Sequence, residues 1–197
     1  MSAAFSFCVA RPLSGASPRF VRIASWRLDA PVERVWEVLS DVESWPRWWP
    51  DLLAVRRVRE GRDDGVGALN EFTWRSRLGY RLRLMVETRS VRRPEVIEGV
   101  ALGDVSGHGL WLLDASSAGS VQVTYRWDVR LERTWMRFAM PLLRPLFSWS
   151  HAAVMRRGAR GLAGALGCSM LDFHDYAALP QWPTDAETGP RRRAHHE

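Results

Sequence analysis

The 197-residue sequence predicts an α+β fold in which a long C-terminal helix covers one face of an antiparallel sheet. Apolar and polar residues alternate in several runs between residues 52 and 131, as in strands with one solvent-facing side. After residue 134 the apolar residues recur every three or four positions, which indicates a helix. An antiparallel sheet must bury its apolar face, and this helix is the only predicted element large enough to cover it.

The first predicted strand spans residues 22–30, and two short helices follow it. In "APVERVWEVLSDV", residues 30–42, Pro31 suits a first helical turn, and apolar residues recur at helical spacing. "SWPRWWP", residues 44–50, predicts a second brief helix or turn. We expect Trp48 or Trp49 to pack under the sheet, and Trp45 to fix the turn.

Six further strands are predicted over residues 52–60, 68–77, 80–91, 95–104, 105–115 and 121–131. Leu78-Gly79 reads as a hairpin turn, and "SAGS" over 117–120 as another turn. The last run, "VQVTYRWDVRL", is the clearest strand. Its alternation places Tyr125 and Trp127 on the apolar face, and Arg126 and Asp128 on the polar face.

The long helix is predicted over residues 134–167, with Pro141 and Pro145 kinking or breaking it near its start. "TWMRFAMPLLRPLFSW", residues 134–149, is apolar on most faces. One interpretation is a buried helix entrance. The other is a portal to the interior that makes transient contact with a membrane surface or a partner. Arg or Pro interrupts every apolar stretch, so we expect no transmembrane helix.

Length and composition predict one domain, over residues 20–170, with flexible tails at 1–19 and 171–197. The first tail has a composition that loosely resembles a transit peptide, but a disordered tail or an overlong gene start is the favoured interpretation. The cysteines, Cys8 and Cys168, form no CxxC motif, which favours a reducing cytoplasm.

The distribution of charge and the absence of several motifs argue against several classes of function. The net charge is +6, but the arginines are spread along the chain, which argues against a nucleic-acid-binding protein. The sequence has no metal-ligand spacing, phosphate-binding loop or nucleophile elbow. We therefore expect neither a metal nor another cofactor.

The segment "LDAPVERVWEVLSDVESWPRWWPDL", residues 28–52, resembles the opening signature of the START-like (SRPBCC) superfamily. The resemblance is to its polyketide cyclase/dehydrase and lipid-transport group. It continues through "IEGVALGDVSGHGLWLL" and "VTYRWDV", and covers about residues 21–167. It implies a helix-grip fold, in which a seven-stranded antiparallel sheet curves around the C-terminal helix and encloses a deep, mostly apolar cavity. Members of this superfamily bind lipids, sterols, quinones, aromatic polyketides or plant hormones, and some are aromatase/cyclases.

In such a fold the inward-facing side chains line the cavity. The predicted ligand-binding residues are Trp49, Asn70, Phe72, Trp74, Tyr80, Leu82, Leu84, Trp111, Tyr125, Trp127, Phe147, His151 and Met155. The same side chains would also serve as an ordinary filled core. Asn70 and the two tyrosines are polar groups on an apolar surface, which suits a flat ligand with one or two oxygens.

No catalytic residue is assigned from the sequence. His151, Tyr125 and Tyr80 are the candidates for acid–base chemistry. His151 lies on the predicted inner face of the helix, but no carboxylate at helical spacing orients it, and a satisfied core histidine explains it as well. His108 lies in a glycine-rich strand, where we expect it to be exposed.

Three functions fit this sequence. The first is binding or transport of a hydrophobic or aromatic small molecule, such as a lipid, polyketide or quinone. The second is a polyketide aromatase/cyclase or dehydratase, in which the three acid–base candidates would converge on one point. The third is an interaction module of the ribosome- or quinone-associated type, which an exposed apolar patch near residues 134–149 would favour.

Overall fold

The computed structural model describes residues 18–116 and 119–179, and it confirms the predicted fold class. Short helices separate the first two strands, and a long helix follows the seventh. In chain order the elements are β1 (Arg19–Leu28), α1 (Val32–Ser40), a 3-10 turn (Val42–Ser44), α2 (Trp45–Trp48), β2 (Leu52–Arg59), β3 (Leu69–Arg75), β4 (Arg81–Arg92), β5 (Val96–Gly103), β6 (Val105–Ala115), β7 (Val121–Leu131), α3 (Thr134–Leu166) and β8 (Met170–Ala177).

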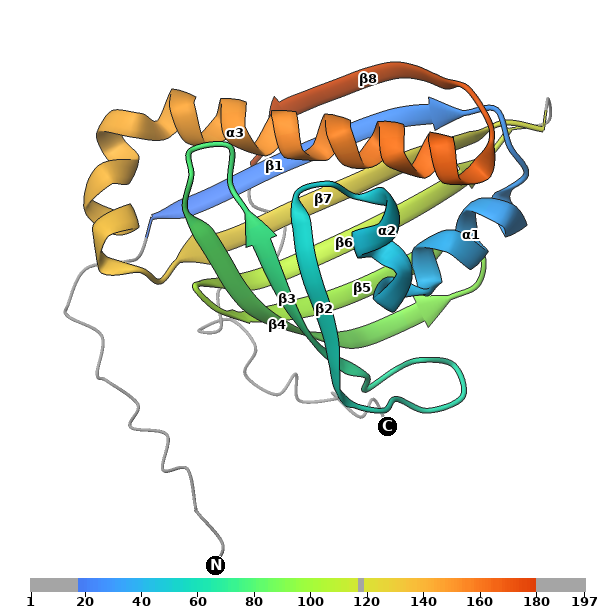
Figure 1. The fold of residues 1–197 in the computed structure, drawn as a ribbon, viewed down its shortest axis with the longest axis horizontal. Coiled ribbons are helices and arrows are strands. Elements are labelled where there is room, and N and C mark those ends of the chain that lie inside the picture. Colours follow the sequence, from blue (N-terminus) through green and yellow to red (C-terminus); the bar gives the residue numbers. More distant parts are fainter. Residues whose placement is uncertain (1–17, 117–118, 180–197) are drawn as a thin grey trace, which may run out of the picture.

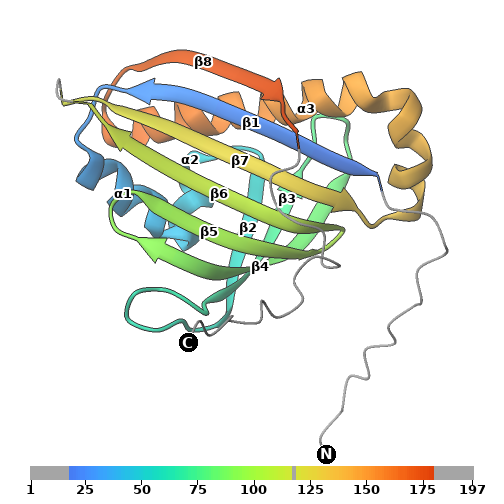
Figure 2. The same cartoon turned by 180° about the vertical axis from the view of Figure 1, so that it is seen from behind.

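The strands form one antiparallel sheet in the order β2-β3-β4-β5-β6-β7-β1-β8. Helices α1, α2 and α3 all lie on the same side of this sheet (Figure 1), and Figure 2 shows the opposite side. Register shifts between β2 and β3 and between β4 and β5 bend this half of the sheet. The sheet therefore curves around a space that α3 covers.

Local sequence explains where several elements begin and end. Helix α1 buries Val35, Trp36 and Leu39, which share one helical face. Gly79, with φ of 87°, closes the β3–β4 hairpin at the predicted position, and its N–H donates to the Ser76 carbonyl at 3.1 Å.

Helix α3 is continuous from Thr134 to Leu166. The prolines do not break it, but its first turns run at an angle to the rest (Figure 1). It ends at Gly167, whose left-handed φ of 67° directs its N–H to the carbonyls of Ala163 and Gly164. No helix in the described part of the chain is both long enough and apolar enough to span a bilayer.

The prediction of a flexible tail from residue 171 is wrong for residues 171–177. They belong to β8, an eighth strand, which pairs with β1 from Arg22↔Ala177 to Leu28↔Met170. Likewise, β1 begins at Arg19, three residues before the predicted strand. The remaining parts of the predicted tails, residues 1–17 and 180–197, lie outside the described residues.

Two expectations about exposure are also corrected. Arg126 and Asp128, expected on a solvated face, are buried. Asp128 accepts from Arg19 Nε at 2.6 Å, and Arg126 donates to the Leu179 carbonyl. The interpretation of residues 134–149 as a buried entrance is wrong as well, because large apolar side chains of this segment are exposed.

Candidate ligand-binding cavity

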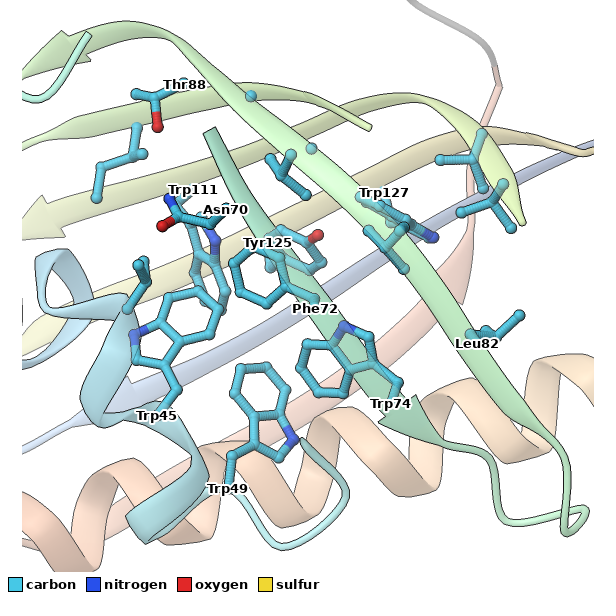
Figure 3. A pocket seen from close by; sticks show the side chains of 18 of the residues that line it. Trp45, Trp49, Asn70, Phe72, Trp74, Leu82, Thr88, Trp111, Tyr125 and Trp127 are labelled. Atoms are coloured by element: carbon cyan, nitrogen blue, oxygen red, sulfur yellow. The ribbon is translucent and has the colours of Figure 1, made fainter. Parts of the chain in front are cut away.

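A cavity of about 660 Å³ lies between the curved sheet and the helices. This volume falls within the range of roughly 300–1,000 Å³ that is usual for small-molecule sites. All thirteen predicted ligand-binding residues line it, from Trp49 on the α2 side to Met155 on α3. Figure 3 shows aromatic side chains from the sheet and from the α2 region directed into the same space. The inward-facing set therefore surrounds a void, although ligand binding by these residues stays a prediction.

The tryptophans of "SWPRWWP" hold one side of the cavity in place. Trp45 Nε1 donates to the Leu39 carbonyl at 3.1 Å, which ties α2 to α1 as expected. Trp49 Nε1 donates to the Val154 carbonyl of α3, also at 3.1 Å, and Trp48 stacks on Trp49 with ring centroids 5.5 Å apart. The cluster thus connects both short helices to the long one. Trp45 and Trp49 are also buried parts of the cavity wall.

Further rings extend this wall across the sheet. Trp49 meets Trp74 edge to face at a centroid distance of 4.9 Å, and Trp45 meets Trp111 in the same manner at 5.7 Å. Trp111 contacts Tyr125 at 4.3 Å. Such packing fixes large flat surfaces with few rotatable bonds, which produces a rigid aromatic lining.

Gly109 of β6 gives these rings the space they occupy. A Cβ atom on this residue would lie 3.0 Å from Tyr125 Oη and 3.1 Å from Trp127 Cζ3. Gly109 itself lines the cavity. In the sequence, this glycine only loosens a predicted strand. In the structure, it leaves room for the rings of Tyr125 and Trp127, which form the β6–β7 floor of the cavity.

Polar groups occupy two parts of the lining. Near the β2–β3 connection, Arg57 Nε donates to Asn70 Oδ1 at 3.3 Å, and Asp64 and Thr88 also line the cavity. In the centre, burial raises the pKa of Tyr125 because the phenolate would be desolvated. Its hydroxyl therefore stays protonated and can donate a hydrogen bond.

Near the β3–β4 hairpin, Ser76 and Ser150 join the sheet to α3, with 3.1 Å between their hydroxyl oxygens. Tyr80 lies beside them, and burial raises its pKa. Its ring contacts Phe147 of α3 at a centroid distance of 6.3 Å. This part of the wall is therefore built from both the hairpin and the helix.

His151 has a carboxylate partner that the sequence did not reveal. Its Nδ1 lies 3.2 Å from Asp175 Oδ2 of β8, and Asp175 also pairs with Arg22. Burial, with repulsion from Arg22, lowers the pKa of His151 to about 3. The imidazole is neutral at physiological pH, so Nδ1–H donates to Asp175. This carboxylate is not at helical spacing on α3, in keeping with the sequence; it comes from β8, the strand that was predicted as part of a tail.

The three acid–base candidates contact different groups. His151 packs on Phe20, Tyr125 on Trp111 and Trp127, and Tyr80 on Trp135 and Phe147. Within the described ranges, no hydrogen bond or ring contact joins any two of the three. His108, expected to be exposed, is half-buried, with Nδ1 3.6 Å from Glu98 Oε1, and it does not line the cavity.

Several lining residues were not predicted. Trp36 and Leu39 lie on the buried face of α1, so their helical spacing was a usable signal. Val86 continues the β4 alternation, and Ser150 and Val154 lie beside His151 on α3. Across residues 18–116 and 119–179, no group of three or more His, Cys, Asp or Glu side chains is placed to hold a metal ion.

The fold and cavity define a START-like, helix-grip protein. The family model for polyketide cyclase/dehydrase and lipid transport matches residues 24–167, and the chain belongs to this family.

Solved structures share the fold at low sequence identity. An aromatase/cyclase from a Streptomyces species is 16% identical, with a TM-score of 0.64 over 76% of this chain and 94% of its own. A Thermus thermophilus protein is 18% identical, with a TM-score of 0.63 over 76% of this chain and 97% of its own. A START superfamily protein from Mycobacterium smegmatis is 12% identical, with a TM-score of 0.62 over 75% and 97%. No curated protein sequence matches this chain.

Proposed function

We propose that this protein binds and carries a hydrophobic, largely flat small molecule in the cavity between the sheet and α3. The observation that carries the proposal is the cavity itself, about 660 Å³ and walled mainly by aromatic rings. A void of this size in a tightly packed core loses favourable contacts unless a ligand fills it. The family's lipid-transport and polyketide members support the same class of ligand.

The polar groups of the lining specify the chemistry of the ligand. The carbonyl of Asn70 is engaged by Arg57, so its amide N–H groups are available to a ligand oxygen. The Tyr125 hydroxyl adds a second donor in the centre of the cavity. A polycyclic or quinone-like molecule with one or two oxygens matches this arrangement. The proposal places the protein in a reducing cytoplasm, in keeping with the free thiol of Cys168.

Native mass spectrometry of the purified protein tests the carrier function. We expect a retained molecule that denaturation releases, and we expect Val86→Trp, which fills the cavity from β4, to abolish its retention. Val58→Trp is the matched control, because Val58 is exposed on β2 and does not line the cavity. A protein that retains no molecule and binds no hydrophobic dye contradicts the proposal.

A specific observation favours a second candidate, an aromatase/cyclase or dehydratase. His151 lines the cavity, is neutral, and is held through Nδ1 by Asp175, which leaves Nε2 as an acceptor for a substrate proton or hydrogen bond; burial makes it a weaker base than a free imidazole. Under this hypothesis His151→Gln removes turnover of a polyketide-like substrate and leaves ligand retention intact. Unchanged turnover excludes His151 from any reaction.

A further inference from the structure

One face of the first half of α3 carries large apolar side chains that the rest of the protein does not cover. This docking face consists of Trp135, Phe138, Leu142, Leu146 and Trp149, which are separated by three or four residues. Phe138 and Leu142 project furthest, with 81% and 83% of their surface exposed. None of these five side chains lines the cavity.

The other side of the same helix faces the cavity. Met136, Phe147 and Met155 are buried and line the void. Helix α3 therefore has apolar side chains on two sides, only one of which the sheet covers. An exposed apolar face of this kind marks an interaction site, because leaving it in water is unfavourable.

The charge of α3 indicates which partner fits this face. Residues 134–166 contain five arginines and neither Asp nor Glu, in a chain of net charge +6. Arg160 is exposed and continues the spacing of the docking face along the helix, whereas the Arg156 guanidinium lies over the Phe173 ring of β8, 4.8 Å from its centroid. Apolar side chains that project singly, next to basic residues, suit insertion into an anionic lipid surface.

Trp135 connects the docking face to the cavity wall. Its ring lies 5.1 Å from that of Tyr80 and 6.3 Å from that of Phe147, measured between centroids. Both of these residues line the cavity. If a bilayer holds Trp135 at its interface, only the side chains of Tyr80 and Phe147 separate Trp135 from the cavity.

We propose that the docking face binds the surface of an anionic lipid bilayer. Phe138 and Leu142 enter the hydrocarbon boundary, and Trp135 and Trp149 lie at the headgroup level, where tryptophan is favoured. Arg160 contacts the anionic headgroups. The use of this contact for ligand exchange rests on the proposed carrier function, but the docking does not.

Vesicle flotation of the full-length protein tests the docking directly. We expect the protein to float with vesicles of equal parts phosphatidylglycerol and phosphatidylcholine, and to float less with phosphatidylcholine alone. The double variant Phe138→Ser/Leu142→Ser should lower the partition coefficient at least about tenfold, because two apolar side chains no longer leave water. Arg160→Gln should lower it about fivefold, and only on the anionic vesicles.

Matched controls separate the docking face from general surface properties. Val58→Ser/Leu102→Ser removes two exposed apolar side chains from strands, and Arg81→Gln removes an exposed arginine from β4. Neither control should change flotation. Circular dichroism of each variant verifies folding.

Three results overturn the proposal. The first is no flotation with either vesicle, and the second is equal loss in the docking-face and control variants. The third is a dimer in light scattering that Phe138→Ser/Leu142→Ser dissociates, since a second copy would then cover the face. Ligand retention in native mass spectrometry is measured without vesicles, so a failure of docking and a failure of the carrier function give different results.

Discussion

Trp49 occupies the space that a side chain on Gly158 would need. A Cβ atom on Gly158 would lie 2.1 Å from Trp49 Cε2, far inside van der Waals contact. One turn earlier in the helix, the Val154 carbonyl accepts the indole N–H of Trp49. A ring close-packed on helix backbone in this way sets how near α3 can come to the α2 region, and so fixes one dimension of the cavity.

Gly158→Ala is expected to destabilise the protein in spite of the better helix propensity of alanine. Overpacking of a fixed core costs about 1–3 kcal/mol, whereas the exchange of glycine for alanine in a helix gains roughly 0.5–1 kcal/mol. Because the indole is fixed by its hydrogen bond, we expect a net loss of about 1–2 kcal/mol. Urea denaturation measures the change in the free energy of unfolding.

Two other glycines of α3 serve as comparisons. A Cβ on Gly161 would lie 1.8 Å from the Trp48 carbonyl oxygen, and backbone yields less readily than a side chain, so Gly161→Ala should cost more than Gly158→Ala. Gly164 is exposed with nothing within 4 Å, so Gly164→Ala should stabilise by roughly 0.5–1 kcal/mol. Equal effects of all three substitutions would contradict the role assigned to the tryptophans.

Asp175→Asn is expected to destabilise strongly. The Asp175 carboxylate is almost fully buried and binds both Arg22 and His151, so its loss leaves the Arg22 guanidinium buried without a counter-charge. Breaking such a buried pair costs about 3–5 kcal/mol. Thermal or urea unfolding measures the loss.

The exposed pair Arg27–Asp172, on the same two strands, is the control for this substitution. Asp172→Asn should cost less than about 1 kcal/mol. The left-handed φ of 53° at this position is one that asparagine tolerates. If both substitutions have the same small effect, β8 does not anchor the sheet edge through Asp175.

The strand β8 could not be predicted from the sequence. Its partners lie far away in the chain: Asp175 binds Arg22 of β1 and His151 of α3, and Phe173 stacks on Trp26 at 6.1 Å. Taken alone, "MLDFHDYA" is short and mixes apolar and charged residues without a regular alternation, and only this distant environment makes it a strand. The strands β3, β4 and β7 were predictable from their period of two, although the face of β7 that was expected to be solvated includes the buried Arg126 and Asp128.

The candidate site was likewise predictable only in part. Alternation and helical spacing identified which side chains face inward, from Phe72 and Trp74 to His151. They could not show whether that interior is full or empty, because the void depends on the separation of α3 from the sheet. That separation is set by contacts such as Trp49 with Gly158, between residues more than 100 positions apart.

The buried His151 is expected to make folding stability depend on pH in the acid range. Its folded-state pKa of about 3 is below its ordinary value of 6.5, so the unfolded chain takes up a proton between these pH values and the folded protein does not. Stability is therefore fully present above pH 6.5 and falls as the pH drops toward 3. Arg22 shares the Asp175 carboxylate, which limits the stabilisation that Asp175 gives to an imidazolium.

Urea denaturation at a series of pH values checks this dependence, with His151→Gln as the comparison. Glutamine can still donate to Asp175 but does not titrate, so the variant should lose less stability between pH 6.5 and 4.5. NMR of the His151 ring nitrogens should show a neutral imidazole at pH 5. A protonated ring at that pH would refute the assignment.

Gly109→Val is expected to weaken ligand binding while leaving the empty protein folded. The added side chain would press on Tyr125 Oη and Trp127, which a Cβ atom already approaches to 3.0 and 3.1 Å. Both rings border the void, which gives them room to shift when bulk is added behind them in the empty protein, so we expect little change in the free energy of unfolding. A bound ligand removes that freedom, and overpacking of about 1–3 kcal/mol then lowers affinity roughly ten- to hundredfold.

Titration with a hydrophobic fluorescent dye measures this change, and Val58→Trp, which adds bulk outside the cavity, should leave dye affinity unchanged. Equal dye affinity in Gly109→Val and the wild type would mean that ligands do not reach the β6–β7 floor.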